Sequence, residues 1–458
     1  MAINLIQFGD KPGYSAIVSS IMDGIARRVL TAGERLPPQR ELAHKLGVAV
    51  ATVGRAYAQL EQQGFVESHV GRGTFIAGGR RREGVTSVEV NVTEAIDLST
   101  YRVPVPDLDG LLADTLKGII AEHHPQKILG SCPTAGHFSH REAVADWLRH
   151  YGVEASAGQV IITNGGQHAT MVALSTLTHA GELIATEEFT DPRMKSVASY
   201  LDRRIIGVDM DAEGMIPDAL EALCNEQNIA AIYVSTRAQN PTNVTLPLER
   251  RVRIAEIARR YDLPIIESDI YGTTMVDPQP PIVAIAPERT HFLTSFGRIA
   301  GPGIKVGCLV SPLNEVTKTQ SGVAMSTGAA TLINAELVSR WIGNGQIDGL
   351  IRWQQAENIR RLSLLATYPK LSCARSDIAS PHVWLALPEP WRAEDFIEAA
   401  SQEGVLIAPT HSFVVGRRTM PHAIRLVIGS PTSVETLQVA CERLERLLNA
   451  QPKSRFEG

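Results

Sequence analysis

The chain has 458 residues, 44% of them hydrophobic, and a formal net charge of −5, which is an ordinary composition for a globular protein. This length exceeds what one hydrophobic core normally serves, so two or three domains are expected. Five scattered cysteines without a Cys-x-x-Cys pair argue against a disulfide framework and against a zinc site.

The N-terminus lacks a basic region followed by an apolar core, and no uncharged apolar stretch is long enough to span a bilayer. We therefore expect a cytoplasmic protein with no membrane partner. Charge is distributed unevenly: residues 1–82 carry 11 Lys and Arg against 6 Asp and Glu, whereas the remaining residues carry 33 against 43. A basic N-terminal part on an acidic body indicates a nucleic-acid contact at one end, although small domains often carry a few net charges.

The first 63 residues show three helical patterns. Apolar residues recur at helical spacing over 15–30, a short helix is predicted over 39–46, and Gly47 fits the turn before a third helix over 49–63. The polar outer face of the third helix consists of Thr52, Arg55, Gln59 and Gln62. Two short helices around a glycine turn predict a helix-turn-helix, whose second helix enters the major groove of DNA.

A β-hairpin is predicted next. Residues 65–70 and 74–76 form its two strands, and Gly71-Arg72-Gly73 forms a glycine-rich tip. This hairpin is typical of a wing, from which Arg72 would reach a minor groove or a phosphate.

Residues 1–79 resemble the winged-helix domain of the GntR family of bacterial repressors. The residues that carry the resemblance are, in order, Gly33-Glu34-Arg35-Leu36-Pro37, Arg40-Glu41-Leu42-Ala43, Thr52-Val53, Ala56-Tyr57, Leu60 and Gly71-Arg72-Gly73-Thr74-Phe75. The resemblance implies that Arg40 and the start of the third helix contact DNA. At that start the family usually has polar or basic residues, whereas this chain has Ala49-Val50-Ala51, so more of the contact is expected from the arginines.

The candidate DNA contacts are polar residues of the third helix and of the segments that flank it. They are Arg35, Arg40, Thr52, Arg55, Tyr57, Gln59 and Arg72. For each arginine the alternative is a solvated surface charge. Residues 80–95, which open with Arg80-Arg81-Arg82, show no apolar period and predict a linker. The arginine triplet either adds phosphate contacts or is merely solvated.

Beyond residue 160, apolar runs alternate with helix-length segments such as 167–178 and 248–261. The runs are 160–163, 183–186, 204–208, 231–235, 264–267, 292–294 and 308–310. Apolar strands joined by helices predict an α/β fold with a mostly parallel sheet covered on both faces. Ligands of such sheets bind at the carboxyl ends of the strands. A long helix from 350 to 365 leads to a smaller α+β region.

The order of these segments resembles the fold-type I enzymes that use pyridoxal phosphate (PLP), the aspartate-aminotransferase family. Joined to a GntR-like head, the chain resembles the MocR branch of the GntR family, in which an aminotransferase-like body senses a small molecule. The resemblance implies four parts: a winged helix-turn-helix over 1–79, a linker over 80–95, a large domain with an N-terminal arm over 96–349, and a small C-terminal domain over 350–458.

Several residues match positions that hold PLP or substrate in that family. Gly165, Gly166 and Gln167 begin a predicted helix, whose backbone N–H groups can bind a phosphate. The resemblance gives the remaining matches: Asn240 and Tyr271 for the phenolic oxygen of PLP, Ser295 for the serine of the Ser-x-x-Lys loop, Lys305 for a phosphate-binding arginine, and Arg425 for the arginine that binds a substrate α-carboxylate.

Other positions depart from the family pattern. Arg298, in the stretch 294–303, takes the place of the lysine that forms an imine with PLP, and a guanidinium cannot form that imine. Ser268 replaces the aspartate that keeps the pyridine nitrogen protonated. Asp269 is one residue along and would point to the other face of a strand. Asp191 replaces the aromatic residue that stacks on the ring. We therefore expect no covalent PLP, and at most weak non-covalent binding.

These residues predict a bacterial transcription regulator and not an enzyme. A homodimeric body would present two winged helices to a double-stranded DNA operator. The former cofactor cleft, made electropositive by Arg298, Lys305 and Arg425, is predicted to bind an anionic or zwitterionic metabolite, such as an amino or organic acid. The alternative is that Arg298 forms an internal ion pair with Asp191 or Asp269 and fills an empty site.

Three further alternatives stay open. The first is a regulator that senses PLP through non-covalent binding. The second is an aminotransferase that forms its imine on another lysine, such as Lys305. The third is a constitutive DNA-binding scaffold without an effector.

Overall fold

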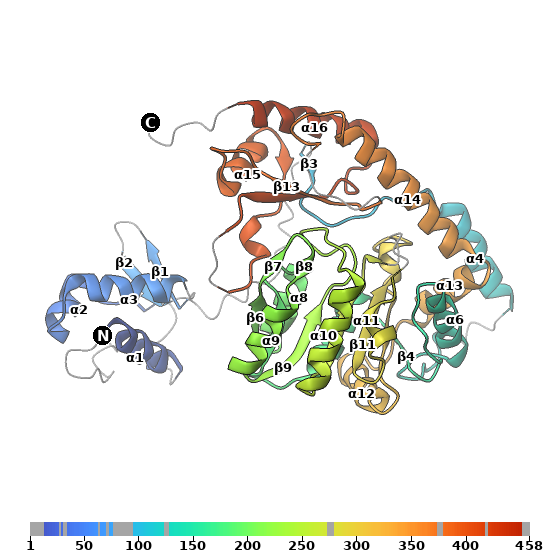
Figure 1. Ribbon diagram of the computed structural model, residues 1–458, viewed down its shortest axis with the longest axis horizontal. Helices are drawn as coiled ribbons and strands as arrows, with labels where there is room; N and C mark the ends of the chain where they lie inside the picture. Colours follow the sequence, from blue (N-terminus) through green and yellow to red (C-terminus); the bar gives the residue numbers. More distant parts are fainter. Residues whose placement is uncertain are drawn as a thin grey trace. The chain divides into compact units, whose positions relative to one another are not determined.

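A computed structural model describes residues 13–26, 29–30, 34–62, 65–69, 73–76, 95–122, 128–272, 279–372, 379–416 and 420–450. The chain divides into two compact units, Met1–Ser87 and Val88–Gly458, which we call the head and the body and describe separately (Figure 1). The tip residue Arg72, the arginine triplet and nearly all of the predicted linker lie outside the described residues.

The head contains the three helices and the hairpin that the sequence predicts. Its elements are α1 (Tyr14–Ala26), α2 (Gln39–Leu46), α3 (Val50–Gln62), β1 (Val66–His69) and β2 (Gly73–Ile76). The two strands pair in antiparallel fashion. Gly47 ends α2 in the left-handed conformation, with φ of 64°, which favours glycine at this turn. One apolar core joins these elements, and it includes Ile17, Leu42, Val53 and Leu60.

A seven-stranded sheet forms the centre of the body. Its strands are β4 (Val160–Thr163), β5 (Leu183–Glu187), β6 (Arg204–Val208), β9 (Ile229–Val234), β10 (Ile265–Ser268), β11 (Thr290–Ser295) and β12 (Gly307–Val310). They lie in the order β4-β12-β11-β10-β9-β5-β6. Only β12 runs antiparallel to its neighbours β4 and β11 in the described sheet, so the predicted mostly parallel sheet is confirmed.

Apolar residues alternate between the two faces of this sheet. Ile184 of β5 packs with α7 (Gly166–Leu177) and α8 (Pro192–Tyr200) on one face. Leu183 and Ala185 pack with helices of the other face. Because both faces are covered, the strands read as unbroken apolar runs. The remaining elements of this region are α4 (Asp109–Glu122), α6 (Phe138–Arg149), β7 (Met210–Asp211), β8 (Gly214–Met215), α9 (Pro217–Glu226), α10 (Leu248–Arg260), α11 (Ile282–Ile285), the 3₁₀ turn η3 (Phe296–Arg298), α12 (Val316–Ser326) and α13 (Leu332–Gly343).

The C-terminal region has its own apolar core. The elements are α14 (Gln346–Leu365), β13 (Val383–Ala386), α15 (Ala393–Gln402), β14 (Val405–Leu406), the 3₁₀ turn η4 (Thr410–Ser412), β15 (Ala423–Leu426) and α16 (Val434–Asn449). Strand β3 (Ile96–Asp97) pairs with β14, and Ile96 and Leu98 belong to this core. Ile96 and Leu98, which the sequence assigns to the large domain, therefore pack in the core of the C-terminal region. The expected division at 350 falls inside the continuous helix α14, which Figure 1 shows running between the two regions of the body.

No helix among the described residues is long and apolar enough to cross a membrane. Within the same residues, no group of three or more His, Cys, Asp or Glu side chains is arranged to hold a metal ion.

Candidate functional site

The predicted cleft residues meet where strands of the large sheet end. Asp191 follows β5 and begins α8, Asn240 follows β9, Tyr271 follows β10, and Arg298 follows β11. Arg425 comes from β15 of the C-terminal region. Residues far apart in the sequence are thus brought to one place, at the carboxyl ends of parallel strands where such folds bind ligands.

Asp191 and Arg193 form the first part of the site. Asp191 caps α8 by accepting a hydrogen bond from the backbone N–H of Arg193 at 2.9 Å. The Arg193 guanidinium donates to both carboxylate oxygens, at 3.1 and 2.8 Å, and also donates to the Tyr271 hydroxyl. Burial raises the pKa of Asp191, but the charge and hydrogen bonds of Arg193 and the hydrogen bond from Asn240 together lower it more, so the net pKa lies well below the usual range. Asp191 is therefore an ion-pair partner and not a ring-stacking surface.

Asn240 connects this ion pair to Arg425. Its amide nitrogen donates to Asp191 at 3.1 Å, and its amide oxygen accepts from Arg425 at 2.8 Å. A second guanidinium nitrogen of Arg425 donates to the carbonyl oxygen of Ser99 at 2.5 Å. Arg425 is 5% exposed, and its Nε atom has no hydrogen-bond partner among the described residues.

Arg298 lies at the end of the 3₁₀ turn η3, half-buried. It donates to the carbonyl oxygen of Tyr101 at 2.6 Å. Its guanidinium carbon lies 4.8 Å from the ring centroid of Tyr101 and 5.4 Å from that of Tyr271. Burial and the neighbouring Arg193 guanidinium lower the pKa of Arg298. Gln354 of α14 holds the backbone of this turn, because its side chain donates to the carbonyl oxygens of Arg298 and Ile299.

The internal ion pair that the sequence offers as an alternative for Arg298 is not formed. Asp191 is bonded to Arg193, and Asp269 is bonded to Arg237, with both of these side chains almost completely buried. Arg298 is bonded to a backbone carbonyl instead. The physical reason is that each carboxylate has a closer arginine within its own neighbourhood.

Ser268 and Asp269 have different surroundings, as the strand alternation predicts. The Tyr233 hydroxyl is hydrogen-bonded to Ser268, and burial raises the pKa of Tyr233. Asp269 pairs with Arg237. The Asp269 carboxylate is therefore already paired with Arg237 and does not take the role of the aspartate that Ser268 replaces.

The predicted phosphate end is partly occupied by the protein itself. Gly165 begins α7 with φ of 87°, and the Gly166 N–H donates to the Ser295 hydroxyl at 3.3 Å. Gln167 and Lys305 are exposed. The backbone N–H that the sequence assigns to an anion thus already has a side-chain acceptor.

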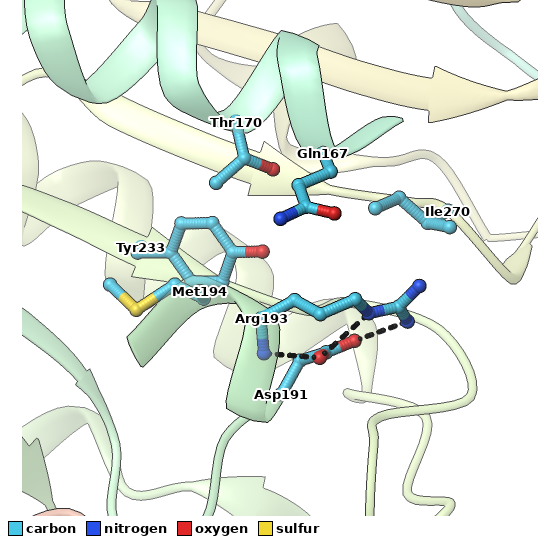
Figure 2. A pocket seen from close by; sticks show the side chains of 7 residues that line it. All are labelled: Gln167, Thr170, Asp191, Arg193, Met194, Tyr233 and Ile270. Carbon is cyan, nitrogen blue, oxygen red and sulfur yellow. Dashed lines mark hydrogen bonds and ion pairs between the residues drawn. The ribbon is translucent and has the colours of Figure 1, made fainter. Parts of the chain in front are cut away.

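Little space remains between these side chains. The cavity has a volume of about 20 Å³, which suffices for about one water molecule. Figure 2 shows the Arg193 side chain below Gln167 and Ile270, with its dashed bonds to Asp191. The lining residues are Gln167, Thr170, Asp191, Arg193, Met194, Tyr233 and Ile270.

In the head, Arg35, Arg40 and Arg55 are exposed, and Thr52 is half-buried. The Arg55 guanidinium lies 4.3 Å from the ring centroid of Tyr14, so its position on α3 is supported by α1. The prediction that Tyr57 contacts DNA must be corrected, because this side chain is buried inside the head.

Tyr57 is 3% exposed, and its hydroxyl donates to the Pro37 carbonyl oxygen at 2.9 Å. It stabilises the head from inside because it lies on the apolar face of α3. The side chain of Gln59, like Arg72, lies outside what the structure describes.

Two family models match the chain. "Bacterial regulatory proteins, gntR family" matches residues 13–76, and "Aminotransferase class I and II" matches residues 93–444. The chain belongs to the aminotransferase class I and II family, with a GntR-type head. This combination is that of the MocR-type GntR regulators.

Relatives named as HTH-type transcriptional regulators match from two thirds to nearly all of the chain. The HTH-type transcriptional regulator YdeF of Bacillus subtilis is 27% identical over 444 residues, 97% of this chain and 96% of its own. The HTH-type pyridoxine biosynthesis transcriptional regulator PdxR of Corynebacterium glutamicum is 29% identical over 316 residues, 67% of this chain and 68% of its own. The protein is therefore a DNA-binding transcription regulator with an aminotransferase-like body.

Solved structures show the same fold. An archaeal alanine:glyoxylate aminotransferase superposes with a TM-score of 0.71 at 23% identity, covering 87% of this chain and 95% of that one. Kynurenine aminotransferase of Pyrococcus horikoshii superposes with a TM-score of 0.72 at 21% identity, covering 79% and 93%. Because aminotransferases of this fold bind PLP, the cleft of the aminotransferase-like body is the expected place for such a group.

Three residues of the site were missed at the sequence level: Arg193, Ser99 and Tyr101. Arg193 had a usable signal, because an arginine in the first turn of a helix opposes the helix dipole unless a carboxylate pairs with it, and Asp191 stands two residues before it. Ser99 and Tyr101 accept the arginine hydrogen bonds through backbone carbonyls, which leave no mark on the sequence, and the Tyr101 ring also lies against Arg298.

Proposed function

We propose that the aminotransferase-like body recognises a small anionic or zwitterionic metabolite without forming a PLP imine, and that this recognition changes the affinity of the GntR-type head for DNA. The observation that carries the proposal is Arg298, which stands in the cleft with Arg425 and is bonded to a neutral carbonyl. A guanidinium paired with a neutral acceptor is a natural partner for a carboxylate. Two such bodies would form a homodimer that places two heads on one operator.

The described residues do not fit PLP as the aminotransferases hold it. Arg298 cannot supply the imine nitrogen, and Ser268 cannot hold a proton on the pyridine nitrogen as a carboxylate does. The cavity beside Arg193 holds about one water molecule, so a pyridine ring would enter there only after the surrounding side chains had moved. For these reasons we propose that the protein is not a PLP-dependent enzyme.

DNA binding is tested with the full chain and a duplex selected from a random library. Binding should weaken steeply with salt, because each neutralised phosphate contributes a slope of roughly −0.9 in log K against log salt. Arg40→Ala should reduce the affinity about tenfold, as expected for a lost charge-assisted contact. Arg102→Ala, which removes an exposed arginine of the body, is the matched control. Salt-independent binding, or equal affinity of the Arg40→Ala variant, would contradict the proposal.

A regulator that binds PLP without a covalent bond is the second candidate. It is favoured by Asn240 and Tyr271, which keep the positions for the phenolic oxygen, and by the name of the relative PdxR. Titration with PLP followed by dialysis separates the two: our proposal expects no saturable binding at micromolar PLP. The remaining hypothesis is an aminotransferase with its imine on the exposed Lys305. Borohydride treatment followed by mass spectrometry tests it, and a reduced PLP adduct on Lys305 would support it.

A further inference from the structure

Three guanidinium groups converge on two stacked tyrosine rings. The rings of Tyr101 and Tyr271 lie 4.2 Å apart. Arg298 lies against both rings, Arg425 lies 5.8 Å from the Tyr101 centroid, and Arg193 is bonded to the Tyr271 hydroxyl.

Asp191 is the carboxylate that acts on all three of these arginines. Both of its oxygens are engaged by Arg193. Among the described residues, two positive charges, those of Arg298 and Arg425, are therefore left without a carboxylate hydrogen-bonded to them.

The two arginines are instead bonded to one short stretch of backbone. Arg425 donates to the carbonyl oxygen of Ser99, and Arg298 donates to that of Tyr101. We call residues 99–101 the placeholder segment. A neutral carbonyl is a weaker partner for a guanidinium than a carboxylate is. The segment therefore occupies the two arginines without balancing their charge.

This arrangement leaves two buried polar atoms unsatisfied. The Nε atom of Arg425 and the hydroxyl oxygen of Tyr101 have no hydrogen-bond partner among the described residues. Both residues are more than nine-tenths buried. Buried polar groups are almost always hydrogen-bonded, and an exception at a site indicates an absent partner. The Nε atom belongs to one of the two arginines, and the Tyr101 ring centroid lies 4.8 and 5.8 Å from the two guanidinium carbons, which points to one occupant.

We propose that the ligand of this cleft is a dicarboxylate, and that it binds by displacing the placeholder segment. One carboxylate takes the place of the Ser99 carbonyl on Arg425, and the other takes the place of the Tyr101 carbonyl on Arg298. This inference rests on the proposed function, and it adds the ligand class and the part of the chain that moves.

The part of the chain that is displaced begins after Leu98. Leu98 is fixed because its N–H donates to the Leu406 carbonyl at 2.9 Å and its own carbonyl accepts from Val427 at 3.0 Å. Ser99 and Thr100 are held by the Asp97 side chain, at 2.8 and 3.0 Å from their N–H groups. Movement therefore begins after Leu98, only a few residues beyond the stretch of chain that leads to the head.

The test is calorimetric titration of the full chain with succinate or glutarate, with propionate as the monocarboxylate. We expect the dicarboxylates to bind about tenfold or more tightly than propionate, the ratio for one added charge-assisted pair. Arg298→Gln should abolish that ratio, Arg298→Lys should keep most of it, and Arg204→Gln, at an exposed position of β6, should leave it unchanged. An unchanged ratio in Arg298→Gln overturns the proposal, as does tighter binding of inorganic phosphate or PLP than of either dicarboxylate.

Hydrogen exchange measures the displacement independently of any variant. The amides of Ser99 and Thr100 should exchange about tenfold faster with saturating succinate, because displacement of the segment breaks their hydrogen bonds to the Asp97 side chain. Slower exchange would mean that the ligand binds over the segment, which contradicts its displacement. Salt-dependent DNA binding is measured on the same preparation without ligand. If it persists while these results fail, only this inference is wrong; if it is absent, the proposed function fails.

Discussion

The body holds two of its arginines in opposite ways. Arg237 and Asp269 are almost completely buried and form a closed ion pair in which each charge has its partner. Arg298, by contrast, is half-buried, lies near a second arginine, and is bonded to a neutral carbonyl. The first arrangement is what a stable interior requires. The second leaves an interaction to be completed, which is typical of a binding site and not of a structural core.

The strongest way to test this contrast is to break the closed pair. Arg237→Met leaves the Asp269 carboxylate buried without its partner, so we expect a loss of about 3–5 kcal/mol of stability. Urea unfolding followed by tryptophan fluorescence measures it, because all five tryptophans lie in the body. Adding Asp269→Asn to the same chain should restore part of the loss. A single variant as stable as the original chain would show that the pair is dispensable.

The half-buried pair of Arg193 and Asp191 should have a smaller effect that depends on pH. The folded state lowers the pKa of Asp191 below its usual 3.8, so its stabilisation is present at neutral pH and is lost as the pH falls through the lowered pKa. We expect Arg193→Gln to cost about 1–2 kcal/mol near pH 7 and clearly less near pH 3. Urea midpoints at several pH values check this. A cost that grows toward low pH would have the wrong sign.

In the head, Tyr57 and Arg40 provide the same contrast between a structural residue and a binding residue. Tyr57→Phe removes a buried hydrogen bond to Pro37, and we expect it to lower the stability of the head by about 1 kcal/mol without changing DNA affinity. Arg40→Ala should do the reverse, because Arg40 is exposed. Calorimetry and DNA titration of both variants measure the two properties. A large loss of DNA affinity in a folded Tyr57→Phe variant would return Tyr57 to the DNA contacts.

The smallest change in stability is expected at Arg298 itself. Arg298→Gln loses one bond to a carbonyl, but it also removes the repulsion from Arg193 and the cost of burying a charge. We therefore expect unfolding to change by no more than about 0.5 kcal/mol in either direction. Urea unfolding alongside Arg237→Met provides the comparison. Equal losses in the two variants would remove the distinction between a structural and a binding arginine.

The sequence predicted the fold well because its signals are local. Each expected strand from 160–163 to 308–310 is found close to its predicted limits, since apolar runs in a buried sheet leave a continuous mark. The packing of Ile96 and Leu98 was not predicted, for the opposite reason. They pack with residues 365–448 of the C-terminal core, far away in the sequence, and nothing in their own spacing shows which partner they choose.

The site was predicted only in part. Asn240, Tyr271, Arg298 and Arg425 do come together, as the resemblance implied. The partners of the two arginines were not foreseen, because a backbone carbonyl is present at every residue and only the folded chain shows which one is used. Lys305 was expected in the pocket but is exposed, and its role in binding phosphate stays a prediction.

Gln354 has a mechanical consequence. It lies near the middle of α14, and its side-chain amide bonds to the carbonyls of Pro104, Arg298 and Ile299 at once. A helix of 20 residues is about 30 Å long, so a tilt of roughly 5° about that point moves each end by about 1 Å. Residues of α14 pack in the apolar cores of both regions of the body, so a tilt of the helix at the Arg298 loop would be felt in both.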